Sequence, residues 1–270
     1  MKPHAKQARG FTILELIVAT GIFLIICAAM FELLNVAQLK YSSETQVTGA
    51  YQDVRLALDQ IVRDINISGF PSAQMFSVLP PATQFASNPV AWSPAYPVTP
   101  CLIGTGGGGT CATPGDYDLI VETNLPGDNF VSWIWYHYDP VTQTLFREVV
   151  PKNAGDPLAA VSGANTQTAL VRNVVNVPGA LMGQITATYP AMFPAGQPVP
   201  IFQYECDPPA GTPGGVVPCP AAAGNNSPQY VRDVDVTLIV MTQQRDLQTQ
   251  TLKLVELFGR GHRANPTNTD

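Results

Sequence analysis

The sequence predicts an α+β fold in which one long N-terminal helix packs, by its second half, on an antiparallel β-sheet. Three observations predict this fold. Residues 11–34 are almost wholly apolar, residues 47–65 repeat apolar side chains at helical spacing, and residues 117–258 contain segments of strand character. The chain has 270 residues, which is enough for one membrane-spanning segment and one folded domain.

The N-terminal region divides into two segments of opposite character. Residues 1–10 are polar and basic, whereas residues 11–34 would form an apolar helix about 36 Å long. That length is enough to cross a hydrocarbon core, which is about 30 Å thick. Because positive charge stays on the cytoplasmic side, we expect a short cytoplasmic N-terminus, a single pass through the inner membrane and a periplasmic or extracellular head beyond about Lys40.

Three ways of processing this N-terminus compete. A secretory signal would be cut near Cys27-Ala28-Ala29, which form only a fair site. A lipoprotein signal needs a small residue before the cysteine, whereas Ile26 precedes Cys27. The third interpretation places the cut before the apolar stretch, between Gly10 and Phe11.

The third interpretation is favoured by a resemblance. The segment Gly10–Ala19 (GFTILELIVA) closely resembles the class III signal of type IV pilins and pseudopilins, with a small basic leader before the glycine and an acidic residue at the fifth mature position. The resemblance implies that a prepilin peptidase cuts after Gly10 and methylates the new amino-terminal Phe11. It also implies a pilin-like fold with a protruding helix.

Glu15 is the acidic residue of this signal. A carboxylate near the centre of a membrane-spanning helix costs about 2.5–3.5 kcal/mol, and less toward an end, so it needs a cationic partner. After cleavage, the α-amino group of Phe11 is largely protonated near neutral pH. The resemblance implies that Glu15 of one subunit pairs with the Phe11 amine of a neighbour in a filament. The alternative is a partly exposed Glu15 at the membrane face.

The second half of the predicted helix has one apolar face. Its apolar residues recur at spacings of three and four: Val47, Tyr51, Val54, Leu58, Ile61 and Ile65. We expect the helix to run from Phe11 to about Ile67 and to stop near Gly69, with Pro71 just beyond. The segment Val54–Ile65 resembles the helix end of PilW-type minor pilins and of J-type pseudopilins of type II secretion.

The sequence of residues 70–258 predicts a β-rich head with long Pro/Gly loops. Strands are expected at Tyr117–Thr123, Phe130–Tyr138, Thr144–Val150, Ala169–Val177, Asp233–Met241 and Thr251–Phe258. The aromatic strand around Trp133 and Trp135 is expected to pack in the core rather than contact a ligand. The predicted organisation is a leader at 1–10, a membrane or filament-core helix at 11–34, an amphipathic helix at 35–69, a head at 70–258 and a flexible tail at 259–270.

Four cysteines form two close pairs, and each pair lies in a Pro/Gly-rich loop. An even set of cysteines beyond an export signal predicts two local disulfides, Cys101–Cys111 and Cys206–Cys219. A single zinc site built from the four thiolates is the alternative, although neither pair has the C-x₂₋₄-C spacing.

The sequence contains no pattern that predicts catalysis or a cofactor. It has three histidines and neither an H-E-x-x-H motif nor a G-x-S-x-G motif, and the glycine-rich segment at 104–110 lacks a G-K-[ST] ending. Calcium is an open possibility at the acids of two strands, although solvated carboxylates explain them as well: Asp116, Asp118 and Glu122, or Asp233 and Asp235. The net charge is −6, and removing the three cations of the leader gives −9, which disfavours nucleic acid as a partner.

The resemblance implies a structural, non-enzymatic subunit, a minor pilin or pseudopilin of a type IV pilus or of a type II secretion system. It also implies the partners: a prepilin peptidase, other minor pilins or pseudopilins, the major pilin, and an assembly platform in the inner membrane. A tip adhesin or a DNA-uptake pilin is the alternative of another class.

Overall fold

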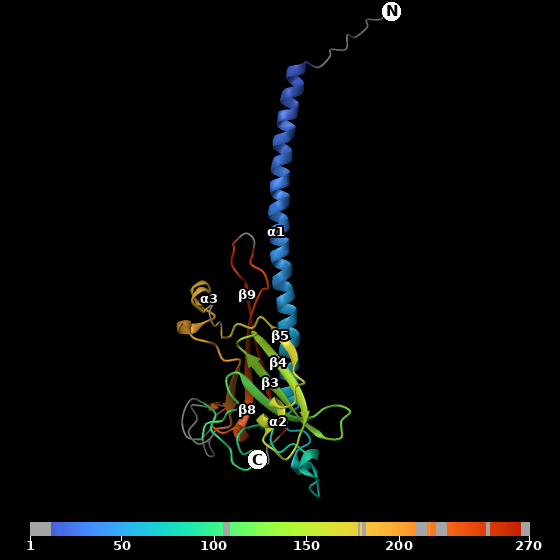
Figure 1. Cartoon of the computed structure of the whole chain (residues 1–270), viewed down its shortest axis with the longest axis vertical. Coiled ribbons are helices and arrows are strands. Elements are labelled where there is room, and N and C mark those ends of the chain that lie inside the picture. Colours follow the sequence, from blue (N-terminus) through green and yellow to red (C-terminus); the bar gives the residue numbers. More distant parts are fainter. Residues whose placement is uncertain are drawn as a thin grey trace, which may run out of the picture.

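The computed structural model has one long helix that projects from a β-rich head (Figure 1). The structure describes residues 12–104, 109–177, 179, 182–208, 215, 217–219, 226–246 and 249–265. Helix α1 (Ile13–Asn66) is continuous, because no proline lies within it, and it ends one residue from the position predicted. Its N-terminal half stands clear of the head in Figure 1, and its C-terminal half lies against the strands.

The head contains two antiparallel sheets where the sequence predicted one. The first sheet has the order β1-β2-β3-β4-β5, and its strands are β1 (Val90–Ala91), β2 (Asp118–Asn124), β3 (Val131–Asp139), β4 (Thr144–Pro151) and β5 (Thr168–Arg172). The second has the order β7-β6-β8-β9, and its strands are β6 (Phe202–Cys206), β7 (Val217–Pro218), β8 (Val231–Met241) and β9 (Leu254–His262). An isolated bridge between Val174 and Val240 joins the two sheets.

Short helices complete the head. Two are α-helical, α2 (Pro157–Ser162) and α3 (Met182–Thr188). In the described ranges, single 3₁₀ turns lie in the connections at Ala73–Met75, Ala82–Gln84, Pro194–Gly196 and Pro228–Tyr230.

The main core lies between α1 and the inner faces of both sheets. Val54, Leu58 and Ile61 of α1 meet side chains of β2, β3 and β8 in one apolar cluster. On β8, the alternation predicted from the sequence holds, since Val234, Val236, Leu238 and Val240 belong to this cluster.

A second apolar cluster covers the opposite face of the first sheet. Trp133 and Trp135 lie there beneath Val161 of α2, whereas Tyr136 and Tyr138 point into the main core. Both faces of β3 are therefore covered, and the aromatic residues are core residues, as the sequence predicted.

The predicted ends of two segments differ from the structure. The tail was predicted to begin at Gly259, but β9 continues to His262 because its last residues pair with β8. The strand predicted at Ala169–Val177 ends at Arg172 in the structure. The sequence reasoning also missed β6, a five-residue strand that lies between proline-rich connections and shows only a short alternation.

Candidate functional site

The site that the sequence singled out begins at the N-terminal end of α1. Gly10 and Phe11 lie outside the residues that the structure describes. Thr12 is the N-cap of the helix, and the backbone N–H of Glu15 donates to its hydroxyl oxygen at 3.3 Å. The backbone N–H and the hydroxyl of Thr12 both donate to Glu15 Oε2 at 3.0 Å.

Thr12 and Glu15 thus form a capping box, which the sequence analysis did not identify. The T-x-x-E spacing in Thr12-Ile13-Leu14-Glu15 is the signal that identifies it. In the single chain, Glu15 is held by Thr12 rather than by a cation, and its carboxylate is turned back toward the residue that follows Phe11.

The first half of α1 exposes its apolar side chains on every face. No residue from Ile13 to Asp53 is buried, and Cys27 is a free thiol. Among the residues described, α1 is the one helix that is long and apolar enough to cross a membrane. The N-terminal part of this half stands clear of the head (Figure 1), and the head reaches its C-terminal part, where Ser43 donates to Asp246 at 3.0 Å.

The second half of α1 lies directly on β9. A Cβ atom at Gly261 would stand 2.6–2.7 Å from side-chain atoms of Ile65, and one at Gly259 would stand 2.9–3.0 Å from Leu58. Such distances are shorter than van der Waals contact. At Gly261 one of the close atoms is the Cβ of Ile65, which moves only with the helix, so this position admits only glycine while the helix remains in place. At Gly259 the close atoms belong to the end of the Leu58 side chain, which must turn aside if a Cβ is added. Both glycines fall in the segment that the sequence analysis assigned to a flexible tail.

A buried polar cluster fixes the same half of the helix to the first sheet. Asp64 of α1 is buried, and its Oδ2 accepts from the Tyr136 hydroxyl at 2.6 Å. Arg147 donates to the same oxygen from Nε at 3.0 Å and from its terminal nitrogen at 2.8 Å. Gln60, one turn earlier, donates to Oδ1 at 2.8 Å. Burial, and then the charge of Asp64, hold the pKa of Tyr136 well above its usual value, so the phenol stays a donor.

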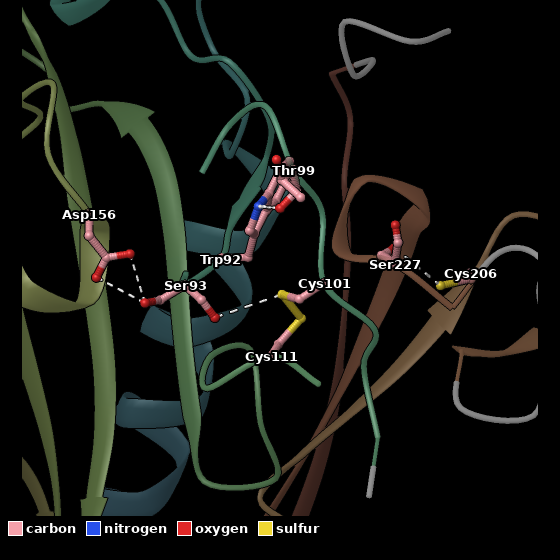
Figure 2. Close-up of a disulfide and its surroundings, with 8 residues drawn as sticks. All are labelled: Trp92, Ser93, Thr99, Cys101, Cys111, Asp156, Cys206 and Ser227. Carbon is pink, nitrogen blue, oxygen red and sulfur yellow. Dashed lines mark hydrogen bonds between the residues drawn. A yellow bond between two sulfur atoms is a disulfide. The ribbon is translucent and has the colours of Figure 1, made fainter. Parts of the chain in front are cut away.

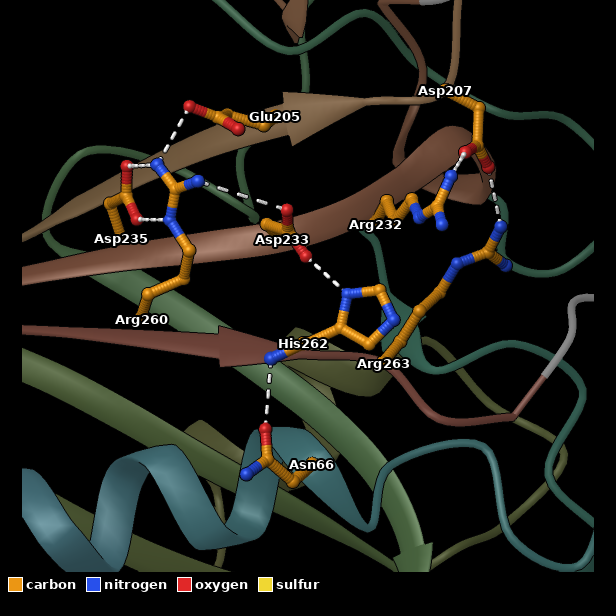
Figure 3. A network of polar contacts seen from close by, with 9 residues as sticks. All are labelled: Asn66, Glu205, Asp207, Arg232, Asp233, Asp235, Arg260, His262 and Arg263. Atoms are coloured by element: carbon orange, nitrogen blue, oxygen red, sulfur yellow. Dashed lines mark hydrogen bonds and ion pairs between the residues drawn. The ribbon is translucent and has the colours of Figure 1, made fainter. Parts of the chain in front are cut away.

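The C-terminal end of α1 is tied to both sheets. Gly69 adopts a left-handed conformation, with φ of +79°, and its N–H donates to the carbonyl of Glu122 on β2 at 2.7 Å. On the other side, the backbone N–H of His262 donates to Asn66 Oδ1 at 2.8 Å (Figure 3). The helix therefore leaves the head in one fixed direction.

Charged residues form ion pairs on the face of the second sheet that points away from the core (Figure 3). Arg260 contacts Asp235 at 2.5 Å and Glu205 at 2.9 Å, and His262 lies 2.5 Å from Asp233. Beside them, Arg232 and Arg263 both contact Asp207, at 3.3 and 2.6 Å.

These contacts show which of the candidate acids are free to bind calcium. Asp233 and Asp235 are paired with cationic side chains, Asp118 lies 2.6 Å from Nδ1 of His137, and Glu122 is buried against Lys152. Within the described ranges, no group of three or more His, Cys, Asp or Glu side chains is arranged to hold a metal. Four of the five candidate acids therefore already have partners, and Asp116 alone does not provide the several oxygen ligands that a calcium ion needs.

Both cysteine pairs are disulfide-bonded in the structure. Figure 2 shows the bond between Cys101 and Cys111, and the second bond joins Cys206 to Cys219. The four thiolates are thus not gathered as a zinc site. Residues before the first disulfide are held to the start of α2, because the Ser93 hydroxyl donates to the two oxygens of its N-cap residue, Asp156, at 2.7 and 2.9 Å. Trp92 adds a bond from its indole N–H to the Thr99 carbonyl at 3.1 Å.

Residues 5–31 match the family model of the prokaryotic N-terminal methylation motif. Comparisons with curated proteins and with solved structures give no significant match. Proteins that carry this motif are generally structural subunits without enzymatic activity. The apolar helix within the motif is consistent with anchoring in the inner membrane before assembly. With this signal at its N-terminus and a pilin-like α+β architecture behind it, the chain is a prepilin-type protein of the type IV pilus and type II secretion superfamily.

Proposed function

We propose that the protein is a minor pilin or pseudopilin, a structural subunit that enters a type IV pilus, or primes its assembly, after a prepilin peptidase cuts between Gly10 and Phe11. The observation that carries the proposal is the two-part character of α1. Its first half contains no buried residue and begins within the methylation motif, which ends at residue 31, and its second half is fixed in the head.

The exposed half of α1 needs an apolar environment, because an all-apolar helix surface is unstable in water. Before assembly the lipid bilayer supplies that environment, and after assembly the parallel helices of neighbouring subunits supply it. The inner-membrane assembly platform transfers the subunit from the first environment to the second. The fixed packing of the second half then sets how far the head stands from the filament axis.

Glu15 changes its partner during this transfer in our proposal. In the single chain the capping box with Thr12 satisfies the carboxylate. In the filament, the methylated and positively charged Phe11 amine of a neighbour offers a stronger, charge-assisted hydrogen bond. Because the carboxylate already points back toward the N-terminus, it requires little rearrangement to meet that amine.

The same signal and helix serve a pseudopilin of a type II secretion system, which is the alternative within this class. A tip adhesin or DNA-uptake pilin is the alternative of another class. DNA is disfavoured by the net charge of −6, since phosphate binding needs clustered Lys and Arg.

The proposal is tested by Glu15→Val in the full chain, with Glu32→Val as the matched control in the same helix. We expect both variants to be cut after Gly10, and only Glu15→Val to lose at least about tenfold in filament incorporation, as expected for a lost pairing of about 1.4 kcal/mol or more. Incorporation is measured by immunoblotting sheared filaments against the membrane fraction. Equal incorporation of both variants would contradict the role of Glu15.

A further inference from the structure

A long uncharged segment follows α1. Between Asp64 and Asp116 the chain contains no Asp, Glu, Lys, Arg or His. The first part of this segment forms a loop at the end of the head farthest from the N-terminal end of α1, drawn in teal at the bottom of Figure 1. We call residues 70–84 the distal loop.

The distal loop exposes large apolar side chains to solvent. Val78 is 82% exposed, Leu79 58%, Met75 56% and Phe70 46%. Single exposed apolar residues are common on soluble proteins, but four within ten residues, with no charged neighbour in the chain, indicate an interaction surface.

The distal loop is organised before any partner binds. Two 3₁₀ turns, Ala73–Met75 and Ala82–Gln84, shape it. At its first end, the Phe70 carbonyl accepts from the Asn124 N–H at 2.8 Å, and the Pro71 carbonyl accepts from the Ala86 N–H at 2.7 Å.

A buried ion pair holds the segment that follows the loop. Lys152 donates from Nζ to the Phe85 carbonyl at 3.0 Å and to the Ser87 hydroxyl at 2.8 Å, and it pairs with Glu122. A surface that is ordered in advance loses less conformational entropy when it binds. The apolar side chains of the loop are therefore presented on a fixed base.

The opposite end of the head has a different chemistry. The connection between β8 and β9 lies beside the middle of α1, where Ser43 donates to Asp246 at 3.0 Å. It carries Arg245, Asp246 and Lys253, and Lys253 lies 3.6 Å from Asp246. If copies of this chain stacked in parallel, the uncharged loop of one would meet this charged connection of the next. The loop would remove water from these charges and supply no charged partner in its place.

The composition of the distal loop also disfavours a lipid surface. Peripheral binding to anionic membranes uses Lys and Arg beside the apolar residues, and the loop has neither. A protein surface that is apolar and uncharged fits without leaving a buried charge unpaired.

We propose that the distal loop docks onto a different prepilin-type subunit, whose facing surface is apolar and uncharged. This chain then lies nearer the membrane than that subunit, because the loop is at the end of the head farthest from the N-terminal end of α1. The proposal rests on the proposed function, because that function sets the parallel orientation of the subunits.

Site-specific photo-crosslinking in cells tests the proposal. A benzophenone side chain is placed at Val78 in the full chain, and the control position is Val141, which is 89% exposed in the turn between β3 and β4. That turn lies at the other end of the first sheet, because β3 begins beside the distal loop and runs away from it. We expect Val78 to give a conjugate with a second protein that carries its own methylation motif, at least fivefold above the yield at Val141.

Three results would overturn the proposal: conjugates with a second copy of this chain alone, conjugates with lipid alone, or a yield at Val78 no higher than at Val141. Processing of the leader is measured in the same cells by mass spectrometry of the N-terminus. A missing cut after Gly10 would refute the proposed function itself, whereas a normal cut with one of the three results would refute only the docking site.

A pair of charge substitutions gives a second readout. Val78→Asp adds one carboxylate to the distal loop, and Val141→Asp adds the same group to the control turn. Because both side chains are exposed, both variants are expected to fold. We expect Val78→Asp to lower filament number at least fivefold and Val141→Asp to leave it unchanged. Equal filament numbers in the two variants would contradict the docking site.

Discussion

The two halves of α1 are one continuous helix with opposite relations to the rest of the molecule. From Ile13 to Asp53 no residue is buried, whereas Val54, Leu58, Ile61 and Ile65 are in the main core. Residues 13–34 of the first half are apolar almost all round and require lipid or other helices, whereas the second half has one apolar stripe that a sheet covers. The head therefore holds the second half in its core and leaves the apolar residues 13–34 free to change their environment.

The largest expected effect comes from the polar cluster that holds the second half. Asp64→Ala leaves the Tyr136 hydroxyl without its acceptor and Arg147 without its buried carboxylate, so we expect the head to lose about 3 kcal/mol of stability. For a head of this size, that loss lowers the Tm by about 6–12 °C. Thermal unfolding of the detergent-solubilised full chain measures it.

The matched control is Asp59→Ala, on the exposed side of the same helix, which is expected to change stability by less than about 0.5 kcal/mol. Cleavage after Gly10 should be normal in both variants, because the first half of α1 does not depend on the head. A Tm for Asp64→Ala equal to that of the control would show that the polar cluster does not hold the helix.

A smaller effect is expected from the glycine contacts between α1 and β9. Gly261→Ala places a Cβ within 2.6–2.7 Å of Ile65, so the helix must shift, at about 1–3 kcal/mol. Gly49→Ala, in the same helix, meets no atom within 4 Å and should be neutral or stabilising by up to about 1 kcal/mol. Urea unfolding of both variants checks the difference, and a Gly261→Ala midpoint at or above the wild-type value would contradict the close contact.

The smallest effect is a pH dependence that belongs to the head alone. A hydrogen bond to Asp118 raises the pKa of His137 above its ordinary value of 6.5. A raised pKa in the folded state means that this stabilisation is complete below about pH 6.5 and is lost as the pH rises through the folded-state value.

The Tm of the wild-type chain should therefore fall from pH 5.5 to pH 8.5 relative to that of His137→Gln, by an amount equivalent to less than about 1 kcal/mol. Asp118→Asn should remove the same dependence, because it removes the carboxylate that raises the pKa. Parallel pH profiles for wild type and His137→Gln would contradict the assignment.

Much of the architecture was predictable because its signals are local. The apolar run after Phe11, the helical spacing up to Ile65 and the alternation on β8 each follow from a period in the sequence. The division of the head into two sheets was not predictable in this way, because strand pairing depends on contacts distant in sequence, such as that between Val174 and Val240.

Several features of the site were not predicted from the sequence, and each omission has a physical reason. Gly259 and Gly261 were assigned to a tail because residues 259–270 are polar and show no periodicity, yet in the structure these glycines lie in β9 and allow the helix to approach it. Asp64 was not singled out because its partners, Tyr136 and Arg147, lie more than 70 residues away. The capping box is a local signal, the T-x-x-E spacing of Thr12 and Glu15, and it was predictable from the sequence.

We infer that the mature protein begins at Phe11, one residue before the N-cap of α1. Mass spectrometry of the purified mature chain tests it most directly. We predict an amino-terminal peptide that begins with N-methyl-Phe11 and contains Glu15. An amino terminus at Met1, or one within the apolar helix such as Met30, would contradict the account.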